Sequence, residues 1–206
     1  INSKQISFPD NYKHQYEITA VDNFDLCFMR KDPPVNIDYY NKVLLLQHCS
    51  KVRLINSAQS LLTINEKLSI LNFPNLITET LVSQDLGTML EFINKHQTIV
   101  LKPLDSMGGQ GVIKLTANDS DLKEKLSTQT HYMLQKYIPA IKTEGDKRII
   151  IINGKPRGAL LRIPAVNDFR ANLAAGGSFT NYSLNQRDLE ICATLEKYLV
   201  DNGIIL

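Results

Sequence analysis

VLKPLDSMGGQG, residues Val100–Gly111, carries the first structural indication in this chain, because an apolar run delivers a lysine and then breaks into a glycine-rich loop. The run predicts a buried strand, with Lys102 as a cation at its end and Pro103 preventing further pairing. Glycine lacks a Cβ, so a glycine-rich backbone can bring its N–H groups close to an anion. The stretch therefore predicts a phosphate-binding loop, whose glycines are Gly108, Gly109 and Gly111.

The residues after this loop indicate which kind of phosphate site it is. A strand pattern resumes at Val112–Leu115. A P-loop instead needs GxxxxGKS/T, and a dinucleotide-binding GxGxxG leads into a helix. A strand, a glycine loop and a second strand predict a flap that folds over phosphates. The alternative is an ordinary hairpin turn without a ligand.

Strand and helix patterns alternate along the rest of the chain, which predicts an α/β protein. The first strand, helix and strand are expected at residues 26–29, 37–47 and 52–55, an order typical of a parallel sheet. Asn56 and Asn65 are candidate N-caps for the short helices that follow them. Asn153-Gly154 predicts a hairpin between two strands. Capping-box spacing at Ser183–Gln186 predicts the start of a long last helix.

Composition and charge agree with a soluble enzyme. Twenty-three Lys and Arg residues against 21 Asp and Glu give a net charge of only +2, which argues against a nucleic-acid binder. No apolar run approaches the ~18 residues of a membrane span, and no signal peptide opens the chain. We therefore expect no membrane partner and a cytoplasmic location. Cys27, Cys49 and Cys192 are expected to be buried thiols in a reducing compartment.

Several segments together resemble one known family. They are FMRKDPP at Phe28–Pro34, NEKL at Asn65–Leu68, the cation-rich stretch Tyr137–Pro164 and NDFRANLAAGGS at Asn167–Ser178. The chain is similar, almost end to end, to prokaryotic glutathione synthetase, a branch of the ATP-grasp ligases. This resemblance implies an ATP-grasp domain of two α+β lobes that hold the nucleotide, expected at 63–206 and truncated at its C-terminal end. Part of a parallel-sheet, substrate-binding α/β domain is expected at 1–62.

The resemblance also implies which residues bind ATP. Lysines of NEKL and of the LKP strand would hold the triphosphate, the flap would cover it, and the segment leaving a later strand would meet adenine. A solvated surface lysine is the alternative for Lys67. Ser106 stands where the family normally has glycine. The residues expected to bind ATP are Lys67, Lys102, Ser106, Met107, Gly108, Gly109, Gln135, Lys136, Tyr137, Ile138 and Asp146.

Two points about the acidic and catalytic residues follow from the same resemblance. Asp146 would hold a ribose hydroxyl or order the nearby lysines, but IKTEGDKR carries one residue more than the family spacing, which leaves Glu144 as an alternative. Arg148 and Arg162 are expected to stabilise negative charge in the transition state, because a guanidinium can hold phosphoryl or carboxyl oxygens bidentately. A structural ion pair is the alternative for each arginine.

On the substrate side, Arg30 of RKDPP is expected to bind a carboxylate of the dipeptide substrate, with Lys31 as the weaker candidate. The long polar stretch Pro164–Ser178 predicts a lid over the reactive intermediate, with Arg170 and Asn172 facing the substrate.

The function implied is ATP-dependent ligation of γ-glutamylcysteine to glycine through an acyl phosphate. The alternatives are another ATP-grasp carboxylate–amine ligase, of the type that adds glutamate to a ribosomal protein, and a non-catalytic ATP-binding module. The family also implies Mg²⁺ or Mn²⁺, with ligands expected beyond Leu206, so no metal ligand is named here. A homo-oligomer, by resemblance a tetramer, is expected.

Overall fold

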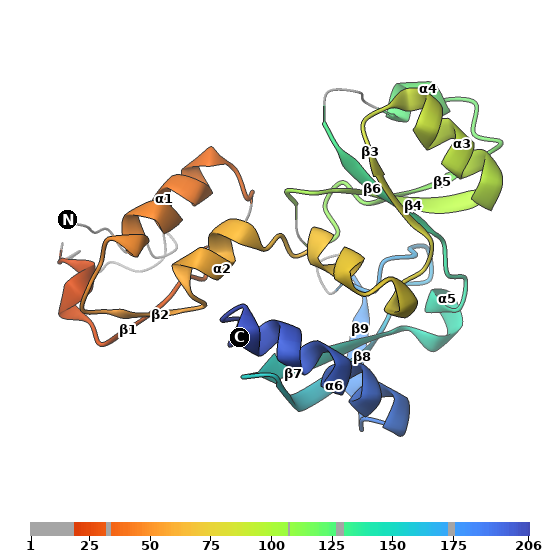
Figure 1. Cartoon of the computed structure of the whole chain (residues 1–206). Helices are drawn as coiled ribbons and strands as arrows, with labels where there is room; N and C mark the ends of the chain where they lie inside the picture. Colours follow the sequence, from red (N-terminus) through yellow and green to blue (C-terminus); the bar gives the residue numbers. More distant parts are fainter. Residues whose placement is uncertain (1–18, 32–33, 107, 127–129, 173–175) are drawn as a thin grey trace, which may run out of the picture.

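The computed structural model describes residues 19–31, 34–106, 108–126, 130–172 and 176–206. The strands form three sheets, of two, four and three strands (Figure 1). The two-stranded sheet belongs to the N-terminal part, and the two larger sheets form the first and second lobes that follow along the chain. Helices accompany each sheet, so the α/β prediction is confirmed.

The N-terminal part is a strand–helix–strand unit with a second helix. After the short 3-10 helix η1 (Val21–Asn23), its elements are β1 (Leu26–Phe28), α1 (Ile37–Gln47), β2 (Arg53–Ile55) and α2 (Ala58–Thr63). β1 and β2 pair in parallel, as predicted, because α1 carries the chain back to the starting end of the sheet. Tyr39 and Val43 of α1 pack with Ala58 of α2 in a small buried cluster.

The prediction that Asn56 caps the following helix is wrong. Helix α2 is capped by Ser57, whose side chain accepts a hydrogen bond from the backbone N–H of Ser60. The Asn56 side chain is engaged elsewhere, since its Oδ1 accepts from the backbone N–H groups of Ile205 and Leu206 at 2.7 and 2.8 Å. Asn56 therefore joins the N-terminal part to the segment that follows the last helix.

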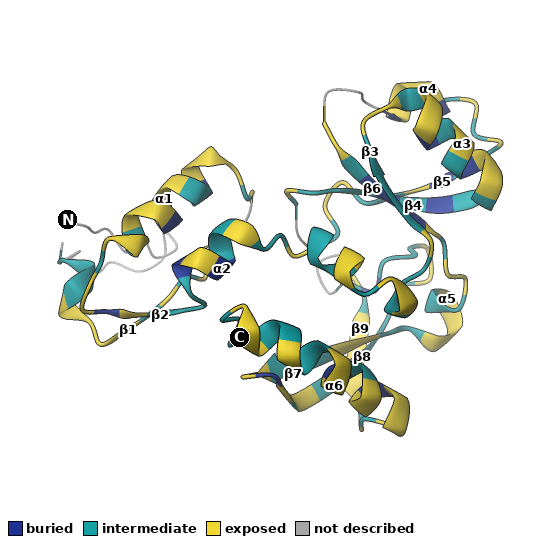
Figure 2. Cartoon of the chain, in the orientation of Figure 1, coloured by how far each residue is buried: buried dark blue, intermediate teal, exposed yellow. Residues whose placement is uncertain are grey.

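The four-stranded sheet forms the first lobe. In spatial order its strands are β3 (Thr80–Ser83), β6 (Tyr132–Lys136), β4 (Thr98–Pro103) and β5 (Ile113–Thr116), all antiparallel. The 3-10 helices η2 (Leu68–Asn72) and η3 (Pro74–Leu76) precede it, and α3 (Leu86–His96) and α4 (Leu122–Lys125) belong to it. Met89 and Ile93, one turn apart on α3, share a buried core with Ile99 and Leu101 of β4. Figure 2 shows the buried segments of this lobe in dark blue.

The second lobe is built on the three-stranded sheet. Its elements are α5 (Ile141–Glu144), β7 (Asp146–Ile152), β8 (Lys155–Ile163), β9 (Ser178–Asn181) and α6 (Gln186–Asp201). β7 and β8 are antiparallel neighbours. The predicted hairpin at their junction is confirmed, because Asn153 and Gly154 have φ values of 50° and 75°, as a tight turn between twisted strands requires.

The last helix begins two residues later than the predicted capping box. Its capping box is formed by Asn185 and Asp188, not by Ser183 and Gln186. Asp188 is buried, and its carboxylate also accepts from the Lys147 ammonium at 2.8 Å and the Tyr182 hydroxyl at 3.0 Å. The aspartate that caps α6 thus also fixes the helix to β7.

Of the three cysteines, only Cys192 is buried, whereas Cys27 and Cys49 are intermediate, so the expectation of three buried thiols is only partly right. Burial raises the pKa of each of these free thiols above its usual value. Within the described ranges, no helix has the length and apolar character needed to cross a membrane.

Candidate active site

A pocket of about 210 Å³ is lined by residues of both lobes. Its walls come from β4 and β6 of the first lobe, from α5 and β7 of the second, and from the segment after β8. The structure therefore brings together residues that are distant in sequence, from Thr78 to Asn172. The predicted site residues in this inter-lobe pocket are Lys102, Gln135, Lys136, Tyr137, Ile138, Asp146, Arg170 and Asn172.

Lys102 is the most enclosed cation of this pocket. Its Nζ donates to Gln135 Oε1 at 2.5 Å, and Gln135 Nε2 donates in turn to Thr80 Oγ1 at 2.9 Å. Burial lowers the pKa of Lys102 below its usual value, and repulsion from Lys67 lowers it further. Because an amide does not neutralise an ammonium, the positive charge of Lys102 remains available to an anion.

The segment leaving β6 presents one free backbone donor. The N–H groups of Lys136 and Tyr137 donate to Glu79 O at 3.0 Å and Thr98 O at 3.1 Å. The Ile138 N–H makes no such bond to any described residue. The Lys136 ammonium turns to the Glu79 carboxylate, 3.4 Å away.

Tyr137 forms an aromatic wall of the inter-lobe pocket. Its ring meets the ring of Phe169 edge-on, with centroids 6.4 Å apart, and Lys114 Nζ lies 5.1 Å from its centroid. The Tyr137 hydroxyl is buried without a hydrogen-bond partner among the described residues. An unpaired hydroxyl in such a wall favours a ligand that can form a hydrogen bond with it.

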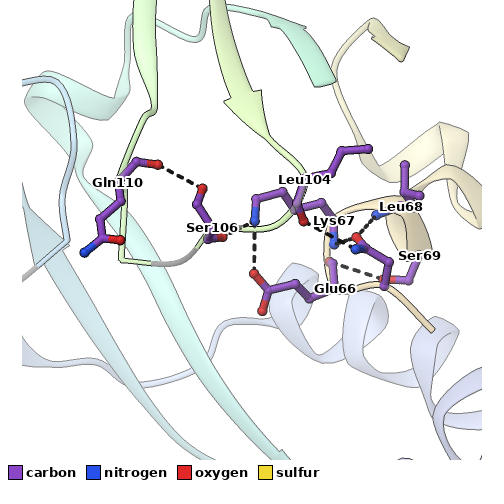
Figure 3. Close-up of polar contacts among 8 residues, drawn as sticks. Glu66, Lys67, Leu68, Ser69, Leu104, Ser106 and Gln110 are labelled. Atoms are coloured by element: carbon purple, nitrogen blue, oxygen red, sulfur yellow. Dashed lines mark hydrogen bonds and ion pairs between the residues drawn. The ribbon is translucent and has the colours of Figure 1, made fainter. Parts of the chain in front are cut away.

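Lys67 lies in the segment between α2 and η2, and its ammonium extends to the flap, as Figure 3 shows. The Asn65 Oδ1 accepts from the backbone N–H groups of Lys67 and Leu68 at 2.9 and 3.0 Å. The N-cap position of η2 is nevertheless Lys67, so Asn65 stabilises the turn before η2 and the prediction that it is the N-cap is wrong. Lys67 Nζ donates to the backbone carbonyl of Ser106 and lies 3.1 Å from Glu66 Oε1. Within the flap, Ser106 Oγ donates to Gln110 O at 2.9 Å. Met107, also predicted to bind ATP, lies outside the described residues.

The flap meets the predicted lid at its glycines. Gly108 and Gly109 have φ values of 62° and 83°, which L-residues with a side chain rarely adopt. A Cβ on Gly109 would come within 3.0 Å of Asn172 Oδ1. The Arg170 guanidinium donates to Gly109 O at 3.1 Å and also binds Asp168 at 2.7 Å. Of the predicted substrate residues, Arg170 therefore binds the flap, and Asn172 lies close to Gly109.

Arg162 and Asp146 pair with one another across the β7–β8 ladder. Arg162 Nε and one terminal nitrogen donate to the two Asp146 oxygens at 2.6 and 2.7 Å. This is a bidentate pair, and it is the structural alternative considered above for Arg162. Of the two acidic candidates, Asp146 lines the inter-lobe pocket and Glu144 is not among the residues that line it.

A second pocket, of about 280 Å³, lies between the N-terminal part and the second lobe. It contains Arg30, at the end of β1, and Arg148, from β7. Neither arginine forms an ion pair with a described residue. The structure thus places Arg148 with Arg30 in this N-terminal pocket, whereas Arg162, two register positions away on the β7–β8 ladder, is held by Asp146.

The residues that line the two pockets but were not predicted include Glu66 and Phe169. Glu66 lines the N-terminal pocket, and Phe169 lines the inter-lobe pocket. Glu66 lies inside the NEKL motif and Phe169 inside NDFRANLAAGGS, and these positions were the only signals of a site role. By residue type alone, a glutamate usually lies on the surface and a phenylalanine in the core.

A divalent metal fits poorly to the part of the chain that the structure describes. No group of three or more His, Cys, Asp or Glu side chains there could hold a metal ion.

Two family models match the chain. Residues 66–206 match the model described as "Prokaryotic glutathione synthetase, ATP-grasp domain", and residues 3–61 match "Prokaryotic glutathione synthetase, N-terminal domain". Among curated proteins, the glutathione synthetase of Prochlorococcus marinus is 38% identical over 97% of the chain, which covers 65% of that protein. That of Neisseria meningitidis serogroup B is 41% identical over 91% of the chain, which covers 61% of it. The chain thus spans less than two thirds of either relative.

Solved structures support the fold alone. The D-cycloserine synthetase DcsG aligns with a TM-score of 0.60 at 16% identity, over 81% of this chain and 61% of that one. A RimK domain ATP-grasp protein from Sphaerobacter thermophilus aligns with a TM-score of 0.59 at 15% identity, over 88% of this chain and 65% of that one. The two-lobed architecture around the inter-lobe pocket is therefore an ATP-grasp fold.

Proposed function

The chain belongs to the prokaryotic glutathione synthetase family, and on that premise we propose that its protein ligates γ-glutamylcysteine to glycine at the expense of ATP. The single observation that carries the proposal is the convergence of Lys67, Lys102 and the glycine flap beside the inter-lobe pocket. Two lysines close enough to lower a pKa repel one another until an anion separates them. A triphosphate supplies that anion.

The inter-lobe pocket suits a nucleotide in its details. The Ile138 N–H, in the segment after β6, has no bond to a described residue, so it can donate to an acceptor on the adenine edge. Tyr137 and Phe169 offer apolar surface for the base. The positive φ values of the flap glycines suit a backbone that approaches the phosphates closely. The pocket is smaller than the ~300–1,000 Å³ of typical ligand sites. Nucleotide entry therefore requires Phe169 and Arg170 to move with the lid.

The N-terminal pocket suits the dipeptide. γ-Glutamylcysteine carries two carboxylates, and Arg30 and Arg148 are two guanidiniums without ion-pair partners among the described residues. In the first step, a carboxylate oxygen of the cysteinyl residue attacks the γ-phosphorus of ATP, and ADP leaves. In the second, the glycine nitrogen attacks the acyl carbon, phosphate leaves, and the nitrogen loses a proton. Charge that develops on these oxygens is the charge that Arg148 would stabilise.

Arg162 has a less direct part in this proposal. While Asp146 holds it bidentately, its charge is compensated. It acts on a phosphoryl oxygen only if Asp146 turns to a ribose hydroxyl. Mg²⁺ or Mn²⁺ belongs to the proposed reaction by family, but no step is assigned to it, because the described residues do not form its site.

Phosphate release by the intact protein tests the proposal. We expect release that requires ATP, γ-glutamylcysteine and glycine together, with glutathione as the product. Glutamate in place of glycine tests the alternative ligase, and release with neither amine beyond one turnover would contradict both. Sedimentation of the same sample tests the proposed homo-oligomer.

A further inference from the structure

Glu66 carries the one side-chain carboxylate among the described residues that line the N-terminal pocket. Three cations share the wall with it, namely Arg30, Lys31 and Arg148. Lys31 lies 3.5 Å from Asp38, which compensates part of its charge. The pocket therefore presents two uncompensated guanidiniums and a single side-chain carboxylate to any ligand.

The Glu66 side chain is open to the pocket while its partner is not. The Glu66 side chain is 64% exposed, whereas that of Lys67 is 14% exposed. The Lys67 ammonium lies between Glu66 and the Ser106 carbonyl, so it belongs to the flap as much as to the glutamate (Figure 3). An exposed ion pair of this kind is weak, so another cation can replace Lys67 at little cost.

The charges of the proposed dipeptide match this pattern. A γ-linked glutamyl group keeps its α-ammonium and its α-carboxylate, and the cysteinyl residue adds a second carboxylate. Two carboxylates and one ammonium correspond to two guanidiniums and one carboxylate. Without Glu66, a purely cationic pocket would accept many dicarboxylates equally well.

We propose that Glu66 selects the α-ammonium of the dipeptide and, on binding it, frees the flap-bound Lys67 ammonium from its ion pair so that it can bind the nucleotide. This inference rests on the proposed function. The Glu66 carboxylate pairs with the α-ammonium in place of Lys67, so its negative charge stays compensated. Lys67 loses its compensating charge and becomes a stronger partner for the triphosphate beside Lys102.

Such an exchange makes the two ligands help one another. If the dipeptide strengthens ATP binding, linkage requires that ATP strengthen dipeptide binding by the same factor. A dipeptide without the α-ammonium leaves Glu66 on Lys67 and produces no coupling. Coupling with the proposed dipeptide, but not with the dipeptide that lacks the α-ammonium, is therefore specific to Glu66.

The experiment compares γ-glutamylcysteine with N-glutarylcysteine, which lacks only the α-ammonium, in the intact protein and in Glu66→Gln. We expect the unaltered protein to bind γ-glutamylcysteine about 10- to 100-fold more tightly in calorimetry, the range of a charge-assisted hydrogen bond. Glu66→Gln should bind the two alike, at the level of N-glutarylcysteine. It should also lose the effect of γ-glutamylcysteine on ATP affinity.

Glu196→Gln is the matched control, because Glu196 pairs with Lys155 on the far side of β8 and touches neither pocket. It should behave as the unaltered protein. Equal losses for both dipeptides in Glu66→Gln would show that Glu66 only positions Lys67, and would overturn the inference. Failure of the proposed function differs from this result: the unaltered protein would then release no phosphate with either dipeptide, and the inference would fall with it.

Discussion

The inter-lobe pocket and the N-terminal pocket are both lined by cations, but they hold them in opposite ways. In the inter-lobe pocket, Arg170 and Lys136 are each paired with a carboxylate, of Asp168 and Glu79, and Lys102 is bound by an amide. In the N-terminal pocket, Arg30 and Arg148 have no carboxylate partner among the described residues. One site is closed on itself, and the other is open to an anion.

This difference indicates how each site receives its ligand. A closed site must exchange internal contacts for ligand contacts, so its occupation costs a rearrangement of the lid and flap. An open site binds without such a change, and its affinity depends directly on charge. We therefore expect the dipeptide site to respond to single charges, and the nucleotide site to respond both to charges and to the contacts that close it.

Lys102→Met is the largest expected effect and separates the two pockets. Methionine keeps much of the apolar stem but removes the ammonium, so ATP binding should weaken by about 100-fold, as expected for ~3 kcal/mol of lost electrostatic stabilisation. Dipeptide binding in the N-terminal pocket should change less than about twofold. Calorimetry with each ligand alone measures both.

Lys123→Met serves as the control for Lys102, because Lys123 is an exposed residue of α4 and lines neither pocket. Its binding constants should stay at those of the unaltered protein. A parallel loss of ATP and dipeptide affinity in Lys102→Met would mean that the two pockets form one electrostatic site. It would contradict the distinction drawn between them.

Arg148→Met tests the N-terminal pocket, and its expected effects on the two ligands are the reverse of those of Lys102→Met. It should weaken γ-glutamylcysteine binding by about 30-fold, or ~2 kcal/mol for a charge-assisted hydrogen bond, and leave ATP binding within about twofold. Arg187→Met, on the exposed side of α6, is the matched control. If ATP binding falls as far as dipeptide binding, Arg148 belongs to the nucleotide site instead.

Local signals made much of this fold predictable. Asn153-Gly154 specified a hairpin because only certain residues accept its φ values. The resemblance likewise named residues from Lys102 to Asn172 that the fold brings into one pocket.

What could not be predicted was the choice among partners that are distant in sequence. Asn56 is a good N-cap by type, but its amide binds backbone 149 residues away. Arg148 and Arg162 were expected to act together, and they lie only two register positions apart, Arg148 opposite Leu160 and Arg162 opposite Asp146. Their surroundings nevertheless differ, because Asp146 binds Arg162 whereas Arg148 lines the N-terminal pocket. Spacing along the chain does not reveal which of two neighbouring arginines on a sheet face is bound by a carboxylate and which is left for a ligand.

Asp168→Asn should loosen the contact that closes the inter-lobe pocket. Arg170 holds the pKa of Asp168 at about 2, below the usual 3.8. A folded-state pKa below the unfolded value stabilises the docked lid above about pH 4, and this stabilisation is lost as the pH falls toward 2. At pH 7 the variant should be cleaved by trypsin after Arg170 about fivefold faster, since local opening becomes easier.

The ligands should act on the same cleavage in the opposite direction. ATP with γ-glutamylcysteine should protect the segment at 164–178 in the unaltered protein, and less so in Asp168→Asn. Asp201→Asn, which alters an exposed pair with Lys197 on α6, is the control. Cleavage at equal rates with and without ligands would show that this segment is not a lid.

Ser106→Ala should give the smallest effect, because it removes one hydrogen bond that pre-shapes the flap and no charge. Ser106 Oγ donates to Gln110 O at 2.9 Å across the loop, and an exposed neutral bond of this kind contributes ~0.5–1 kcal/mol. The KM for ATP should rise about two- to fivefold while kcat stays constant, because the flap is less ordered before the nucleotide binds but equally ordered afterwards. The exposed Ser120→Ala, in the turn before α4, should leave both constants unchanged. A two- to fivefold fall in kcat would show instead that the Ser106 hydroxyl acts in the complex with bound nucleotide. The inter-lobe pocket would then depend more on contacts made with the ligand than on contacts formed before it binds.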